Sequence, residues 1–166
     1  YAAENYSVVI TTGAKSRLWV FGDAAFLQSS YKLLLPREQD WGEVEKVACG
    51  SSHMLLLVKG SDNLYKIMSV GKGIYGKLGD SDTTGRNHGT PVDVDLPYME
   101  IKYTRDVKLR CGKYTSGALI KESTDQTNKN YNLYMWGLVN HKVISNIKDV
   151  ESKHSFGDNF PIDRKS

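Results

Sequence analysis

Short apolar runs separated by glycine-containing and polar turns recur along this chain of 166 residues. Two segments match each other without a gap, namely residues 47–58 (VACGSSHMLLLV) and residues 109–120 (LRCGKYTSGALI). Each has an aliphatic residue, a Cys-Gly break, three polar or aromatic positions and an apolar run that a lysine follows. Such runs, with no long stretch of helical periodicity, predict β-strands.

A second strand that ends in glycine is predicted downstream of each apolar run. Residues 66–71 form it in the middle copy and residues 132–137 in the last copy. The N-terminus supplies a third copy, in which residues 6–11 precede residues 18–22. The spacing of the terminal glycines is typical of propeller blades with insertions, and the polar segment 122–130 lengthens the last interval.

This repeat predicts an all-β fold in which hairpin units stack radially, because each unit buries its apolar faces against its neighbours. A barrel or a sandwich also fits the pattern of short strands. We predict a partial β-propeller over residues 1–140, with copies at about 2–40, 44–105 and 106–140. Residues 141–166 are then a degenerate next-blade strand around Val143 and Ile144, a linker, or a polar tail that docks a partner.

The repeated residues resemble the regulator-of-chromosome-condensation repeat, whose pattern is a Cys-Gly-x-x-His strand, a Trp-Gly strand and a Gly-x-x-Gly-Gln-Leu-Gly loop. Residues 48–53 (ACGSSH), residues 73–79 (GIYGKLG) and the pair Trp136-Gly137 resemble the three signatures. The chain departs from the pattern at other positions, for example where Thr115 replaces the histidine. The signature positions are Cys49, Gly50, His53, Gly71, Gly73, Gly76, Leu78, Gly79, Cys111, Gly112, Trp136 and Gly137.

The resemblance implies a seven-bladed β-propeller, of which this chain, a divergent member or a fragment, supplies about two to three blades. It implies a non-catalytic scaffold for protein–protein interaction, because propeller loops project from a rigid framework. The implied partners are a small GTPase, for a guanine-nucleotide exchange factor-like role, chromatin, or a multi-subunit assembly in which the chain is an adaptor. No enzyme activity and no cofactor are expected.

Two other function classes make different demands on the sequence. A chromatin-associated or nucleic-acid-associated propeller needs a basic stripe, whereas the 22 basic and 19 acidic residues are interspersed. An enzyme with its site in the propeller funnel needs ionisable residues at the inner strand ends, where the copies place serine, threonine and apolar residues. Both remain alternatives to the scaffold.

The loop after residue 70 contains two apparent ligand-binding motifs. Residues 71–78 satisfy GxGxxG, but Leu78 stands where a phosphate loop has its Ser or Thr, and no helix is predicted to follow. Residues 80–85 imitate half of a calcium loop, but Pro91 stands at the twelfth position. We therefore predict no metal site and no nucleotide site.

The same loop is where a partner contact is predicted, against the alternative of a solvated loop whose carboxylates cap turns. The predicted partner-binding residues are Asp80, Asp82, Arg86 and His88. The recurring aromatic residues are expected to pack in the core and between blades: Tyr65, Tyr75, Tyr114, Tyr134 and Trp136.

Cysteine use and hydropathy indicate the compartment. Cys49 and Cys111 have no second cysteine nearby, and we expect both to be reduced and buried. No run approaches the roughly 20 apolar residues of a membrane-spanning helix, so no membrane insertion is expected. These features predict an intracellular, reducing compartment, either the nucleus or the cytoplasm, with an organelle as a further option.

Overall fold

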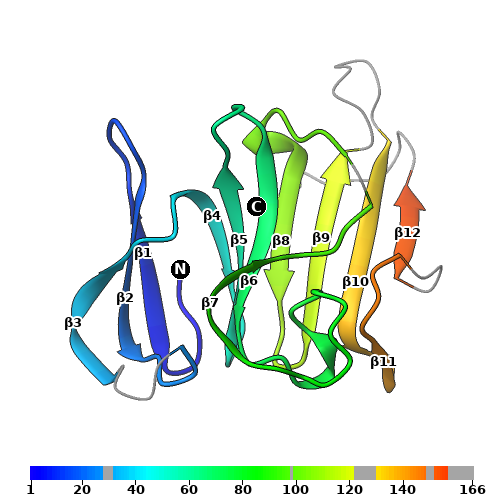
Figure 1. Ribbon diagram of the computed structural model, residues 1–166, viewed down its shortest axis with the longest axis horizontal. Helices are drawn as coiled ribbons and strands as arrows, with labels where there is room; N and C mark the ends of the chain where they lie inside the picture. Colours follow the sequence, from blue (N-terminus) through cyan, green and yellow to red (C-terminus); the bar gives the residue numbers. More distant parts are fainter. Residues whose placement is uncertain (28–31, 98, 122–129, 149–151, 157–166) are drawn as a thin grey trace.

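Three antiparallel sheets lie side by side in the computed structural model, which describes residues 1–27, 32–97, 99–121, 130–148 and 152–156 (Figure 1). The first sheet contains β1 (Tyr6–Thr11), β2 (Arg17–Asp23) and β3 (Lys32–Gln39). The second contains β4 (Glu43–Cys49), β5 (His53–Lys59), β6 (Tyr65–Gly71) and β7 (His88–Asp93). The third contains β8 (Val107–Cys111), β9 (Thr115–Lys121), β10 (Tyr131–Val139), β11 (Lys142–Ile144) and β12 (Lys153–Phe156).

Helical structure in the described residues is confined to two 3-10 turns, η1 (Ile74–Gly76) and η2 (Thr104–Asp106). No helix in these ranges has the length and apolar composition needed to cross a membrane. Val143 and Ile144 lie in β11, which pairs with β10 at the edge of the third sheet. Most of the predicted polar segment 122–130 and residues 157–166 of the predicted tail lie outside the described residues.

The three sheets repeat one local geometry. The first residue of β1, of β5 and of β9 pairs with a glycine in the strand that follows it. The pairs are Tyr6–Gly22, His53–Gly71 and Thr115–Gly137. Gly71 shows why glycine is required: its φ is +120°, and a Cβ there would lie 2.5 Å from the carbonyl oxygen of Ser52. The backbone of Lys72 then donates to that same carbonyl at 2.9 Å. The internal sequence match therefore reflects a structural repeat.

Apolar side chains fill both spaces between the sheets. In β5, Met54 and Leu56 pack with the first sheet, whereas Leu55 and Leu57 pack with the third. All four side chains are fully buried. A central strand that is buried on both faces needs a continuous apolar run, which explains the sequence from position 54 to position 58. The all-β fold class predicted from the repeat is confirmed.

A buried backbone carbonyl joins the second and third sheets. The Lys77 carbonyl oxygen accepts hydrogen bonds from Ser116 Oγ at 2.6 Å and from Trp136 Nε1 at 2.9 Å. Ser116 Oγ also lies 2.8 Å from His53 Nε2. Because a hydroxyl has one proton and Ser116 donates it to the carbonyl, His53 Nε2 carries the proton in its own bond to Ser116. We call His53, Ser116, the Lys77 carbonyl and Trp136 the inter-blade network.

Tyr6 makes the corresponding contact between the first and second sheets. Its hydroxyl donates to the Gly50 carbonyl oxygen at 2.7 Å, and the His53 carbonyl oxygen lies 3.1 Å away. Tyr6 and His53 occupy the same position of the repeat, since each pairs with the repeat glycine. The first residue of β1 and the first residue of β5 thus each reach the next sheet, in two successive copies of the repeat.

Two expectations about burial need correction. Cys49 and Cys111 are free thiols, but both are half-buried and not fully buried, because each ends its strand beside the Cys-Gly break at the rim. Burial still raises the pKa of Cys49 to about 11 and that of Cys111 to about 12. Tyr75 is not a core residue, since 38% of its surface is exposed, but its ring contacts Tyr114 of the third sheet, so the expected packing between blades does occur.

Replacing Ser116 with alanine tests the inter-blade network. Ser116→Ala removes the partner of His53 Nε2 and one donor to the Lys77 carbonyl, and buried polar groups without partners destabilise a fold by about 1–3 kcal/mol. We expect the free energy of unfolding, measured by urea denaturation, to fall by about that amount. Ser7→Ala, at a half-buried position of β1, serves as the control and is expected to change it by less than about 0.5 kcal/mol. Equal effects would contradict the network.

Acid should destabilise the fold through His53. Burial, with a smaller effect of the Lys77 charge, lowers the pKa of His53 from 6.5 to about 3. Between these values the unfolded chain binds a proton that the folded chain does not, so stability falls as the pH falls, by up to about 1.4 kcal/mol per unit. His53→Gln should flatten the dependence of unfolding free energy on pH between about pH 6.5 and 3. His141→Gln, at an exposed position, should leave the slope unchanged.

Candidate partner-binding site

Residues 72–87 leave β6, pass through η1 and return to the second sheet as β7. The loop folds back on itself because Gly73 lies directly against the Arg86 backbone, where a Cβ would collide with the Arg86 carbonyl oxygen. The Gly73 amide also donates to Asn87 Oδ1 at 3.2 Å. Farther along, Leu78 is fully buried, and its carbonyl accepts the Ser69 hydroxyl at 2.6 Å. The signature residues therefore fix the path of the loop.

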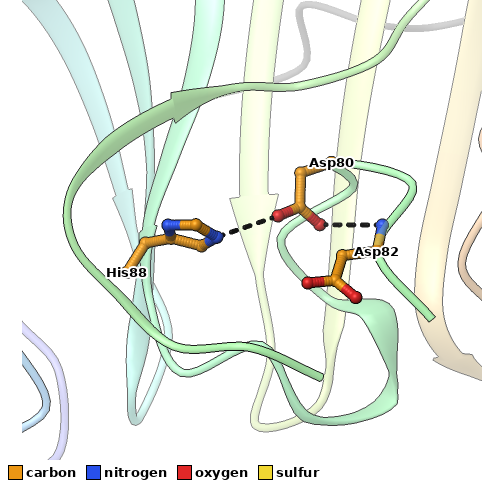
Figure 2. A group of neighbouring side chains, drawn as sticks. All are labelled: Asp80, Asp82 and His88. Carbon is orange, nitrogen blue, oxygen red and sulfur yellow. Dashed lines mark hydrogen bonds and ion pairs between the residues drawn. The ribbon is translucent and has the colours of Figure 1, made fainter. Parts of the chain in front are cut away.

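Three of the four predicted partner-binding side chains converge in this loop, as Figure 2 shows. His88 Nε2 lies 3.2 Å from Asp80 Oδ2, and the Asp82 amide donates to Asp80 Oδ1 at 3.3 Å. The fourth, Arg86, places its Nε 3.8 Å from Asp82 Oδ2. Residues from the middle of the loop are thus linked to residues at its C-terminal end, and the loop presents them as one group.

Hydrogen bonds from Thr84 hold the second carboxylate. Asp82 Oδ1 accepts the Thr84 hydroxyl at 2.6 Å and the Thr84 amide at 2.7 Å. These two bonds keep the pKa of Asp82 below its usual value, with a smaller contribution from the Arg86 charge. Asp82 therefore carries its negative charge at neutral pH and is locked into a turn. The expected turn-capping role and the expected clustering both occur at this residue.

The ligand types in the group invite comparison with a metal site. The nearest ligand atoms of Asp80, Asp82 and His88 all lie within 4.8 Å of one another, and carboxylate with imidazole is a donor set that zinc accepts. In this geometry, however, the donor atoms are bonded within the loop, and the Arg86 guanidinium lies against Asp82. Internal hydrogen bonds and charge balance are sufficient to account for the arrangement.

A surface hollow of about 420 Å³ lies beside this group. Three of its lining residues are apolar or aromatic and exposed, namely Ile74 at 47%, Tyr75 at 38% and Val143 at 54%. The turn at residues 83–85 closes another side. Sequence reasoning missed this surface because Tyr75 was expected in the core or between blades and no role was predicted for Ile74. The sequence did contain one indication that these side chains are exposed. Ile74 and Tyr75 stand between Gly73 and Gly76, in a tight turn that leaves both partly exposed.

Three stacked antiparallel sheets joined by repeated inter-sheet contacts define the chain as an arc of a β-propeller. Solved structures place that arc with propellers of the regulator-of-chromosome-condensation type, which confirms at the level of fold what the signature residues indicated. No family model and no curated protein matches the sequence.

Three of these similar structures are as follows. Prp20p from Saccharomyces cerevisiae, described with its binding to Gsp1p and histones, has a TM-score of 0.58 and 20% identity, over 83% of this chain and 30% of that chain. Human WBSCR16 has a TM-score of 0.60 and 18% identity, over 96% of this chain and 39% of that chain. Yeast RCC1 (Prp20) bound to Kap60 has a TM-score of 0.54 and 20% identity, over 82% of this chain and 31% of that chain. This chain thus spans about a third of the length of each.

The contact between Gly73 and the Arg86 backbone can be tested by limited proteolysis. Gly73→Ala places a methyl group against the Arg86 carbonyl, so the loop must move away from its packed position. We expect trypsin to cleave after Arg86 several-fold faster than in the unchanged chain, as mass spectrometry of the fragments would show. At Gly13 an added Cβ meets only the Lys15 carbonyl oxygen at 4.0 Å, so Gly13→Ala is the control. Unchanged cleavage after Arg86 would contradict the packing.

Proposed function

We propose that this chain belongs to a non-catalytic propeller scaffold that binds a protein partner through the loop at residues 72–88. The observation that carries the proposal is the exposed apolar surface of Ile74, Tyr75 and Val143 around the hollow. Exposed apolar side chains gathered beside a fixed polar group are typical of protein interaction sites. A loop tied down at Gly73 and at the Asp80–His88 pair also loses little conformational entropy when a partner binds.

The charges in the loop support a binding role over catalysis. Asp80 lies against His88 and Asp82 against Arg86, so each carboxylate faces a basic group. Two groups with large pKa shifts are buried and do not line the hollow: the His53 imidazole, which belongs to the inter-blade network, and the Lys77 ammonium group. An acid–base site would need a shifted group that faces the substrate space.

Two observations support the proposed class of partner: the repeat resemblance in the sequence and the structural similarity to Prp20p. A small GTPase or a multi-subunit assembly is the partner that the repeat resemblance implies, and Prp20p, with the same fold, is described as binding Gsp1p and histones. We propose a protein partner of this kind. More specifically, we propose guanine-nucleotide exchange on a small GTPase, to be tested once that GTPase is identified. The two free cysteines are compatible with the proposed reducing compartment.

Site-specific photo-crosslinking tests the proposed function. A benzophenone amino acid would replace Tyr75 in the full chain, produced in its own cells. The matched control would carry the same amino acid in place of Tyr103, which precedes η2 and is similarly exposed at 41%. We expect a discrete protein adduct from position 75 on gels and by mass spectrometry, and no such adduct from position 103. Identical adduct patterns from both positions, or none from position 75, would overturn the proposal.

A further inference from the structure

Next to the hollow, three side chains from two blades lie against the ring of Tyr114. The Tyr75 ring meets the Tyr114 ring edge-on, with centroids 5.1 Å apart. The ammonium groups of Lys77 and Lys113 lie 5.5 Å and 5.4 Å from the Tyr114 centroid. Lys72 is close enough for its charge to act on Lys77. We call Lys72, Tyr75, Lys77, Lys113 and Tyr114 the lysine–tyrosine rim.

We propose that the lysine–tyrosine rim docks an acidic segment of the partner protein, with carboxylates on the exposed ammonium groups of Lys72 and Lys113. This inference rests on the proposed function and adds the chemistry of the partner to it. Tyr75 belongs both to the rim and to the hollow, so one partner segment can place an apolar residue in the hollow and acidic residues on the rim.

The rim lysines form no ion pair with a carboxylate in the part of the chain that the structure describes. The turns that meet at this edge of the second and third sheets, residues 50–52, 72–77 and 112–114, contain three lysines and no acidic residue (lower edge in Figure 1). Among the described residues, no ion pair joins a carboxylate to any of these lysines. Exposed Lys66 and Lys102, by contrast, are each paired with an acidic residue. The uncompensated charge selects an anionic partner.

Lys77 contributes from below the surface. Its side chain is buried, and Nζ donates to Ser52 Oγ at 2.7 Å. Burial, and then the charge of Lys72, lowers the pKa of Lys77 to about 8, so an added negative charge at the rim would favour its protonated form. Because the Ser52 oxygen accepts the bond from Lys77, its own proton can be donated to a carboxylate oxygen of the ligand.

The arrangement favours a protein segment over a nucleic acid. Nucleic-acid surfaces combine a basic track along the phosphates with aromatic faces open for base stacking. Here Lys72 and Lys113 are the exposed lysines of the rim, and the half-buried Tyr114 ring is covered by the edge of Tyr75 and by the two ammonium groups. A short run of aspartate or glutamate beside an apolar residue complements the exposed lysines of the rim and the apolar lining of the hollow.

The test compares two double variants with the same net charge. Lys72→Gln with Lys113→Gln removes the exposed lysines of the rim, and Lys15→Gln with Lys102→Gln removes two exposed lysines elsewhere. Fluorescence anisotropy would follow binding of a labelled oligo-glutamate and of a single-stranded DNA of equal charge. We expect the rim variant to bind the oligo-glutamate about five- to tenfold more weakly and the control to stay within about twofold.

Other results would overturn the inference. Equal losses in both double variants would show an effect of net charge alone, and DNA binding that exceeds oligo-glutamate binding and depends on the rim lysines would show a nucleic-acid surface. The crosslink at position 75 separates the two proposals. An adduct that persists in the rim variant at unchanged yield leaves the partner-binding function intact and contradicts the acidic docking, whereas an adduct lost only in the rim variant supports both.

Discussion

The backbone carbonyl of Lys77 is the acceptor on which the packing of the second and third blades depends. It accepts the buried donors of Ser116 and Trp136, and Ser116 in turn satisfies His53 from the neighbouring blade. Each of these donors would be left without a partner in the apolar space between the sheets if the carbonyl moved. The sheets, the signature side chains and the path of the 72–88 loop are therefore fixed together.

That dependence ties the candidate site to the core. Residue 77 lies one position after η1, so the backbone that closes the inter-blade network also positions Tyr75 at the surface. The Lys77 side chain extends away from its own carbonyl toward Ser52 and Tyr114, where the repeat pattern has glutamine. A lysine at this position keeps the backbone acceptor and adds a cation, so the departure from the pattern changes the surface without changing the blade.

The sequence was most informative where side-chain chemistry repeats locally. The ungapped match predicted the hairpins, and the histidine of the pattern marked a residue that does join two blades. Strand β7 (HGTPVD) was not predicted, because its half-exposed polar residues lack an apolar pattern and pairing with β6 gives it its shape. The hydrogen bonds of the network were also beyond prediction, since Ser116 and Trp136 meet Lys77 only after the sheets stack.

The candidate site shows the same division. The sequence allowed four residues of the loop to be grouped, because short-range turns bring them together: Asp80, Asp82, Arg86 and His88. Asp82 caps the turn at Thr84, and Arg86 follows Asp82 by four residues and pairs with it. The sequence did not predict that Tyr75 is exposed beside these four residues. That exposure depends on a positive φ, which the sequence shows only as a tyrosine between two glycines, and on the third blade supplying Tyr114.

The outer faces of the arc explain why partner binding is assigned to a rim. The central strand β5 is buried on both faces, whereas the described outer sides of the end sheets are mixed. Val9 has polar neighbours on the first sheet, and Leu119, Leu133 and Met135 lie beside Lys108 and Arg110 on the third. Leu119, Leu133 and Met135 line a hollow of about 560 Å³. Apolar side chains on an outer face can pack against a further blade of a stacked array. When such faces are covered, the loops at the rims stay accessible. Among the described loops, the one at residues 72–88 combines a fixed backbone, exposed apolar side chains and, at Lys72, an exposed charge with no ion pair.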